Sequence, residues 1–344
     1  MPGSLEPGIN RRAGAVEKFL NLLLLAGLVL TGFLSLNQGS VDVDLFRAIV
    51  DMLSNVESPE SIIVGDIRLP RTLLALIVGA AMALSGAALQ GLLRNPLVDP
   101  GLVGASQGAA LGAALVFYFN LFSFLGALAT PVAGLIGAAL TLFILMGLSG
   151  SMARPAIIIM AGLAISTLSS SLLAVVLNFA PNPYAMQELV FWLLGSVSNR
   201  GLDHLLVLGP AFIAGCIIIF WQRRLLLGLS LGEQVADSMG LQVARSGRYI
   251  ILGSALLIGS AVAVAGNIGF IGLVVPHLIR PLVNYRPDRL LMPSALAGAI
   301  VVCAADILVR FLPPERELKL GVLTALVGAP FFIWLVWKER QRWI

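Results

Sequence analysis

Charged residues are scarce in this chain. Only 12% of its 344 residues are Asp, Glu, Lys or Arg, whereas 58% are hydrophobic. A soluble globular domain carries about 25% charged residues, so this chain has too few to cover a water-facing surface. Its mean hydropathy of +0.95 agrees with that deficit. Most of its surface must therefore face lipid, and we predict an all-α integral membrane protein.

Cysteine, histidine and lysine are also scarce. Cys216 and Cys303 lie in apolar runs, which excludes a disulfide framework and a Cys-rich metal site. His204 and His277 are too few for a metal cage without nearby carboxylates, and we expect His277 to tie helices together. No lysine follows a glycine, so a G-x-x-x-x-G-K-[ST] loop is absent. We expect no catalytic residue, metal or cofactor in this chain, and energy for active transport from a partner or an ion gradient.

Long apolar runs are abundant. A bilayer core of about 30 Å needs roughly 20 apolar residues per helix, and ten runs approach that length. The sixth run contains a Gly/Ser/Asn break near 195–201, and the first is interpreted as a retained span rather than a cleaved signal peptide. The predicted spans cover residues 19–36, 72–93, 101–119, 124–148, 156–179, 189–221, 249–266, 271–284, 291–312 and 320–337.

Basic residues favour one side of the predicted membrane. When the loops are assigned alternately to the two sides, most of the 22 Lys and Arg residues fall on the side of the N-terminus. The positive-inside rule makes that side cytoplasmic. We therefore expect a single transmembrane domain over 1–344 with a cytoplasmic tail at 1–18, a cytoplasmic loop at 222–248 and a cytoplasmic C-terminus at 338–344.

The two halves of the chain resemble each other at an offset of 180 residues. This offset aligns Gly79 with Gly259 and Pro96 with Pro276, among other matches. Under the predicted topology the two halves have opposite orientations, an arrangement that commonly places a transport path between them. Chance matching in a Gly- and Ala-rich chain is the alternative.

Three arginines lie at span ends on the predicted outer side. Arg68 and Arg71 flank Pro70 before the second span, and Arg310 ends the ninth. Such a face would attract carboxylates of an approaching partner. The alternatives are snorkelling to lipid headgroups and local pairing of Arg310 with Asp306.

The loop 222–248 contains a predicted amphipathic helix. Small and apolar residues recur at helical spacing between Leu229 and Leu241, and Gly240 would end the helix. A helix of this kind could fit a groove on another protein. It could equally rest on lipid.

Two polar groups interrupt the apolar spans. The segment 92–108 combines prolines and glycines with polar side chains, and broken backbone at membrane depth must be buried or face a water-filled cavity. The segment could form a wall of the transport path or a re-entrant hairpin. The hydroxyl groups of the fifth span could line the same path, or they could donate hydrogen bonds to carbonyls of their own helix. The residues predicted to line a path are Asn95, Ser106, Gln107, Ser166, Thr167 and Ser170.

Several ordered motifs resemble one known family, the FecCD-type permeases, which are the transmembrane subunits of ABC importers for iron-siderophores, haem and vitamin B12. The matches together span nearly the whole chain, although the loop 37–66 carries none. They are Ile67-Arg-Leu-Pro-Arg-Thr72, Ser85-Gly-Ala-Ala-Leu-Gln90, Arg94-Asn-Pro-Leu-Val-Asp-Pro-Gly101, Gly269-Phe-Ile-Gly-Leu-Val-Val-Pro-His-Leu-Ile-Arg280 and Gly328-Ala-Pro-Phe-Phe-Ile333.

This resemblance implies a type II ABC importer permease of ten helices in two inverted five-helix halves. The membrane would be the bacterial or archaeal inner membrane, with both termini cytoplasmic. The implied partners are a second permease subunit, two cytoplasmic ATPases that use ATP and Mg, a periplasmic or lipid-anchored binding protein, and membrane lipid. No nucleic acid is expected.

The resemblance also implies roles for particular residues and a cargo. Arg68, Arg71 and Arg310 would meet glutamates of the binding protein. The cargo would be a siderophore or haem, with cobalamin as the alternative, and an ion-coupled secondary transporter remains a hypothesis from another class. The residues implied to couple to the ATPase are Leu231, Gly232, Glu233, Val235, Ala236, Met239 and Gly240.

Overall fold

Every element of the described chain is a helix. The computed structural model describes residues 7–119, 121–150, 155–179, 182–312 and 318–340, so the ends of the predicted cytoplasmic segments, 1–6 and 341–344, lie outside it. The elements are α1 (Pro7–Asn37), α2 (Leu45–Leu53), α3 (Pro59–Ile62), η1 (Ile63–Arg68), α4 (Leu69–Leu92), η2 (Pro100–Val103), α5 (Ala105–Phe119), η3 (Ser123–Leu128), α6 (Ala129–Ser149), α7 (Pro155–Asn178), α8 (Pro183–Leu193), α9 (Asp203–Trp221), α10 (Arg223–Ser230), α11 (Glu233–Ser238), α12 (Val243–Ala265), α13 (Ile271–Ile279), η4 (Arg280–Val283), α14 (Pro287–Arg310) and α15 (Leu320–Arg340).

The predicted number of spans is confirmed for the described residues. Eight helices are long and apolar enough to cross a bilayer, and two shorter apolar helices, Ala105–Phe119 and Ile271–Val283, complete the ten. Both short helices follow a residue with left-handed backbone, Gly104 at φ +84° and Phe270 at φ +67°. The chain is therefore a multi-pass membrane protein in which two of the spans are short.

The predicted sixth span, 189–221, with its break near 195–201, is divided between two helices. Its first part belongs to the separate helix α8, and only α9 is long enough to cross the membrane. The backbone takes left-handed values at Gly195 and Asn199, which ends the helical hydrogen-bond ladder. The break lies where the Gly/Ser/Asn composition predicted it.

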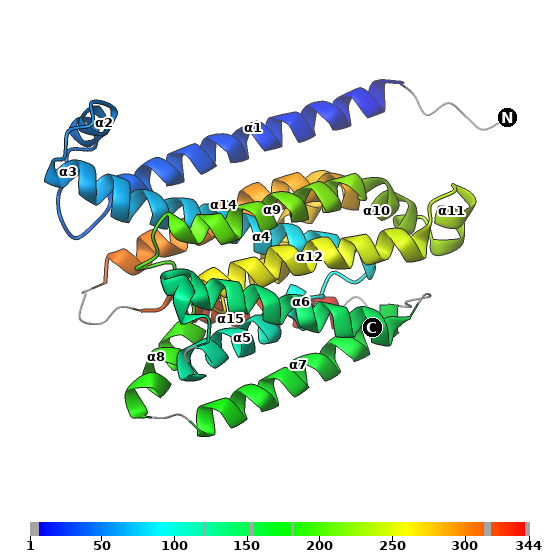
Figure 1. The fold of residues 1–344 in the computed structure, drawn as a ribbon. Coiled ribbons are helices and arrows are strands. Elements are labelled where there is room, and N and C mark those ends of the chain that lie inside the picture. The colour runs from blue at the N-terminus through cyan, green and yellow to red at the C-terminus, as the bar shows by residue number, and fades with distance from the viewer. Residues whose placement is uncertain (1–6, 120, 151–154, 180–181, 313–317, 341–344) are drawn as a thin grey trace.

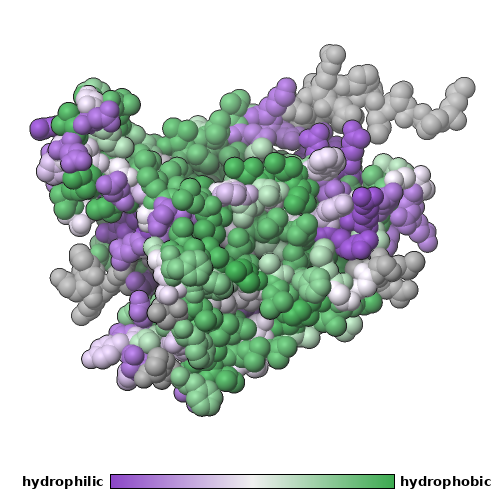
Figure 2. Space-filling view, in the orientation of Figure 1, coloured by the Kyte–Doolittle hydropathy of each residue, from purple (hydrophilic) through white to green (hydrophobic). Residues whose placement is uncertain are grey.

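The helices α4 and α12 form the centre of the bundle and run antiparallel (Figure 1). The most apolar stretch of the α4 span is 83% buried and that of α12 is 78% buried, whereas only 11% of the α1 stretch is buried. The outer helices therefore expose apolar side chains, which form the broad hydrophobic surface in Figure 2. Such a surface is stable in lipid and not in water.

Glycines allow the central helices to touch. A methyl group on Gly86 of α4 would lie 1.8 Å from the carbonyl oxygen of Gly272 in α13, and one on Gly79 would lie 2.2 Å from that of Gly298 in α14. Lipid supplies no hydrophobic drive for helix association, so close backbone approach through small residues supplies much of the packing energy.

Equivalent helix pairs relate the two halves. Helix α4 packs on α14 and α13, and α12 packs on α6 and α5 in the matching arrangement. Gly79 touches α14 and Gly259 touches Ala138 of α6, so these two aligned glycines occupy equivalent contacts. The two halves are thus inverted copies.

The offset of 180 residues does not hold throughout. Pro96 lies in the segment before a short helix, whereas Pro276 lies inside α13, so their alignment is wrong. The non-α-helical segment before the short helix covers 93–104 in the first half but only 266–270 in the second. That difference in length shifts the register between the halves.

Candidate functional site

The candidate sites lie at the two ends of the bundle and near its centre. Helices α2 and α3 lie at one end, and α11 lies at the other (Figure 1). The three predicted docking arginines belong to the α2 end, and the predicted coupling segment belongs to the α11 end.

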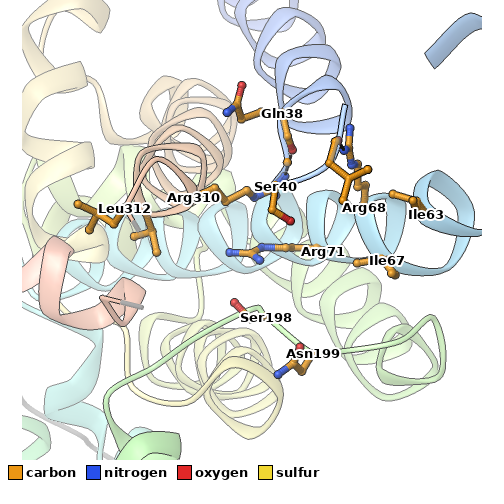
Figure 3. Close-up of a pocket in the computed structure, with 13 residues that line it drawn as sticks. Gln38, Ser40, Ile63, Ile67, Arg68, Arg71, Ser198, Asn199, Arg310 and Leu312 are labelled. Atoms are coloured by element: carbon orange, nitrogen blue, oxygen red, sulfur yellow. Dashed lines mark hydrogen bonds between the residues drawn. The ribbon is translucent and has the colours of Figure 1, made fainter. Parts of the chain in front are cut away.

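Arg68, Arg71 and Arg310 line a single pocket of about 390 Å³, as Figure 3 shows. Arg68 ends η1, Arg71 lies in the first turn of α4, and Arg310 ends α14. The tight packing of α4 on α14 brings the two helix ends together, although their arginines are far apart in sequence. The structure therefore joins the three predicted residues in one place.

Asp306 holds two of these arginines. Its carboxylate accepts hydrogen bonds from Nε and Nη2 of Arg71 at 2.9–3.1 Å and from Nε of Arg310 at 3.0 Å. The Asp306 side chain is only 2% exposed, compared with 20% for Arg71 and 7% for Arg310. The local pairing of Arg310 with Asp306, one of the alternatives from the sequence, is present, and Arg71 joins it.

Arg68 has a different set of partners. Its guanidinium donates to the carbonyl oxygens of Leu36 and Asn37 at 2.9 Å and 2.8 Å, and to that of Val41. The residue is 4% exposed. Arg68 therefore anchors the segment between α1 and α2, and this anchoring forms one wall of the pocket.

The pocket has an excess of positive charge. Three guanidinium groups surround it, and Asp306 is the acid that pairs with two of them. Ser40 and Asn199 also contribute polar side chains to its wall. Such a pocket can accept a carboxylate, because a bidentate contact with a guanidinium is strong where water is partly excluded.

A second pocket, of about 430 Å³, lies where the two short helices begin. The non-α-helical segments before these two helices, 93–104 and 266–270, are called the interrupted segments here, and both line the pocket. The first contributes Asp99 to Leu102, and the second contributes Asn267 to Phe270. Ser106 and Gln107, two of the predicted path residues, also line it. Broken backbone here faces a cavity, as the physics of the bilayer requires.

Gln90, near the end of α4, ties the first of these segments to the start of α13. Its Nε2 donates to the carbonyl oxygens of Val98 at 3.3 Å and Gly272 at 3.4 Å, while its Oε1 accepts from Arg280 at 2.6 Å. Gln90 is 1% exposed. The link therefore holds the first interrupted segment against α13.

Asp99 contributes a carboxylate to the second pocket. Burial raises the pKa of the Asp99 carboxyl above its ordinary value, and the hydrogen bond from the Gly101 N–H at 2.7 Å acts in the opposite direction. The same hydrogen bond caps the 3-10 turn η2. The loop is thus held by a group whose charge depends on pH.

The remaining predicted path residues lie elsewhere. Asn95 is exposed, and its side chain accepts a hydrogen bond from Leu97 N–H at 2.9 Å within a turn. Thr167 donates to the Leu163 carbonyl of its own helix at 2.8 Å, as the back-bonding alternative predicted. Ser166 lies 3.5 Å from the Gly101 carbonyl, and Ser170 is exposed on α7.

The predicted coupling segment forms two helices instead of one. Helices α10 and α11 meet at Leu231 and Gly232, where Gly232 has φ +115° and ψ 151°, a conformation available essentially to glycine alone. The expectation that Gly240 ends the helix is confirmed, because α11 ends at Ser238, Met239 is its C-cap, and Gly240 follows with φ +76°.

An apolar stripe remains exposed on this segment. Leu231, Val235 and Met239 recur every four residues and are 61%, 41% and 56% exposed. Ala236 is fully buried against Gly228 on the opposite side, and Glu233 is exposed. The segment therefore packs on the bundle through one face and presents the other outward.

Sequence reasoning missed Gln90 and Asp99 as site residues and treated Asp306 only as a local partner. A polar side chain inside an apolar run is a detectable signal for Gln90, and the Asp-Pro-Gly sequence is one for Asp99. The partnership between Asp306 and Arg71 leaves no signal in a single sequence, because it depends on how α4 packs on α14.

Comparisons with known proteins cover nearly the whole chain. The family model described as the FecCD transport family matches residues 27–338. The hemin transport system permease protein HmuU of Yersinia pestis is 41% identical over 283 residues, covering 80% of this chain and 84% of the relative. The vitamin B12 import system permease protein BtuC of Vibrio vulnificus is 36% identical over 328 residues, covering 93% and 94%.

A solved structure shares the fold. It is described as an inward-facing conformation of a metal-chelate type ABC transporter, and it is 33% identical with a TM-score of 0.79. The alignment covers 93% of this chain and 99% of that one. The all-helical architecture described above is therefore that of an ABC transporter permease.

Proposed function

The chain belongs to the FecCD transport family, and on that premise we propose that it translocates an iron complex, a siderophore or haem, across the inner membrane. It is the membrane-spanning permease subunit of an ABC importer, so it is a transport subunit and not an enzyme. Membership of this family excludes the alternative hypothesis that the chain is an ion-coupled secondary transporter.

The similarity to a hemin permease carries the choice of cargo, because it reaches 41% identity over four-fifths of the chain. Cobalamin is the second candidate, since a vitamin B12 permease is 36% identical over 93% of the chain. Uptake by the chain reconstituted in liposomes with its ATPase and binding protein separates the two. We expect ATP-dependent uptake of haem or a ferric siderophore; uptake of cyanocobalamin alone would replace the first candidate with the second.

The assembly we propose follows the family pattern. Two copies of this chain surround a central path, two cytoplasmic ATPases bind and hydrolyse ATP with Mg, and a periplasmic or lipid-anchored protein delivers the cargo. The α11 end and both termini face the cytoplasm, and the α2 end faces outward. ATP-driven closure of the ATPases then alternates access to the path.

The arginine pocket is the proposed docking site for the binding protein. Its excess positive charge and its place at the proposed outer end support a role in receiving a partner carboxylate. Arg71 is the most accessible of the three guanidiniums, and Arg68 supports the pocket wall.

Replacing Arg71 by Gln tests this docking site. Hydrogen bonds to charged groups contribute about 1.5–3 kcal/mol, so the dissociation constant for the loaded binding protein should rise at least about tenfold. Arg47→Gln is the matched control, because Arg47 is a 67% exposed arginine at the same end that lies outside the pocket. Equal affinity of the two variants, measured in nanodiscs, would exclude the pocket as the docking site.

The segment around α11 is the proposed contact with the ATPase. The exposed stripe of Leu231, Val235 and Met239 supports it, because apolar side chains on and beside a short helix can fill a groove on another protein. Val235→Glu should abolish co-purification of the ATPase, whereas Gln234→Glu places the same charge beside the stripe and should preserve it. If Val235→Glu keeps the ATPase as Gln234→Glu does, the stripe is not the ATPase contact, and the alternative that it rests on lipid stands.

The polar residues of the second pocket and of α7 are proposed to line the translocation path. Ser106 and Gln107 do so through the second pocket, and Ser166, Thr167 and Ser170 of α7 through a path between two copies. Asn95 would act at the cytoplasmic end. Cysteine substitution at Gln107, followed by thiol labelling during turnover, should show protection by cargo if the residue faces the path.

A further inference from the structure

A separate cavity of about 230 Å³ lies at the α11 end of the bundle. Pro96 lines it, and the neighbouring Arg94 lies 4.0 Å from Glu233 of α11, which places the cavity at that end. One side of the cavity is formed by the end of α13 together with η4, and the other side is formed by the last turns of α15. Its polar wall consists of His277, Arg280, Tyr285 and Lys338.

Arg280 lines this cavity with a guanidinium that the described residues pair only in part. Its Nη2 donates to Gln90 Oε1 at 2.6 Å, which fixes the guanidinium in place. Its Nε is buried and has no hydrogen-bond partner within the described part of the chain. Buried N–H groups are nearly always paired, and the other partner of this guanidinium is the neutral amide of Gln90, so the positive charge of Arg280 is only partly compensated beside the cavity.

Lys338 adds a second positive charge. Its side chain is exposed and lines the cavity, and its Nζ lies 4.8 Å from the centroid of the Trp334 ring. None of the residues that the structure assigns to the cavity wall is an Asp or Glu. Two cations beside a cavity without an acidic wall residue favour an anionic ligand.

The surroundings indicate which anion fits. Leu278, Leu282 and Trp334 are each about half exposed beside the cavity, so it borders the lipid-facing surface. Trp and Lys are typical of the boundary between membrane and water, where phosphate groups are concentrated. Phosphate oxygens accept charge-assisted hydrogen bonds from both arginine and lysine.

We propose that this cavity binds a phosphate group through Arg280 and Lys338. The phosphate belongs either to an anionic phospholipid headgroup or to a soluble phosphate. The site is independent of the docking and coupling surfaces, and it gives the permease a ligand other than its cargo at the proposed cytoplasmic end.

Ligand titration of the purified chain tests the site and its source of phosphate. Native mass spectrometry would count bound dioleoylphosphatidylglycerol against dioleoylphosphatidylcholine, and calorimetry would measure inorganic phosphate. We expect one saturable site that is about tenfold weaker in Arg280→Gln and in Lys338→Gln. Preference for phosphatidylglycerol over phosphatidylcholine assigns a lipid headgroup, whereas binding of inorganic phosphate alone assigns a soluble ligand.

Arg286→Gln is the matched control. Arg286 lies close by in sequence, but its guanidinium is already paired with Asp288 at 2.8 Å and does not line the cavity. Lys338→Gln alters an exposed side chain, so its folding should be unaffected even if Arg280→Gln disturbs the contact with Gln90. Binding that is absent for both phosphate sources, or that Arg286→Gln weakens as much as Lys338→Gln, would overturn the proposal.

Discussion

Asp306 is expected to be among the most sensitive polar positions of the chain. Its carboxylate is 2% exposed and pairs with Arg71 and Arg310 from two different helices. Removing one partner of a buried ion pair costs about 3–5 kcal/mol, because the other charge remains buried and unpaired. Asp306→Asn keeps one acceptor oxygen but places amide hydrogens against a guanidinium. We therefore expect a loss of about 3 kcal/mol in the free energy of unfolding.

Unfolding by sodium dodecyl sulfate in mixed micelles, followed by tryptophan fluorescence, measures this loss. Asp66→Asn is the matched control, since Asp66 is exposed on η1 at the same end and should change stability by less than about 0.5 kcal/mol. If Asp306→Asn costs no more than this control, the carboxylate does not hold the helix ends together.

A double-mutant cycle separates the ion pair from other effects. If Arg71 and Asp306 stabilise each other, the variant that combines Arg71→Gln with Asp306→Asn should lose less than the sum of the single variants. We expect a coupling energy of about 1–3 kcal/mol. Additivity within about 0.5 kcal/mol would refute the assignment of a direct pair.

Two further predictions concern packing and pH. Gly86→Ala should destabilise the chain by about 1–3 kcal/mol in the same assay, because its methyl group would lie 1.8 Å from the Gly272 carbonyl oxygen. Gly147→Ala, with nothing within 4 Å, should be neutral or stabilising and serves as its control. Since burial raises the pKa of Asp99, stability should fall as the pH rises from 3.8 through that raised value, and Asp99→Asn should flatten the dependence of the melting temperature on pH. An unchanged pH profile would show that Asp99 is well solvated.

The number of spans and the place of the break in the sixth apolar run could be predicted from composition, but it could not be predicted that only the part after the break crosses the membrane. Hydropathy records whether a segment prefers lipid, and α8 and α9 are both apolar. What separates them is backbone geometry at Gly195 and Asn199, which the local composition indicates without fixing. The inverted halves were visible at Gly79 and Gly259, yet a constant offset misaligned the prolines because the two halves differ in loop length.

The sequence allowed us to predict which residues belong to the arginine pocket, but not how their side chains are arranged. Arginines at span ends are conspicuous in a chain with so few charges, so Arg68, Arg71 and Arg310 could be identified from sequence. Their different environments could not, because each depends on partners that are remote in sequence. Arg68 bonds to carbonyls of the segment after α1, and Arg71 reaches α14.

Arg71 has enough hydrogen-bond donors to hold Asp306 and to bind a carboxylate of the proposed partner at the same time. Asp306 occupies Nε and Nη2 of the guanidinium, and no described residue is seen to accept a hydrogen bond from Nη1. An arginine has five N–H donors, so a carboxylate from a partner could bind at the Nη1 end while Asp306 keeps its place. Docking would then break no buried ion pair, and the free energy that holds α4 to α14 would stay available throughout the transport cycle. The greater exposure of Arg71, 20% compared with 7% for Arg310, is what this arrangement requires.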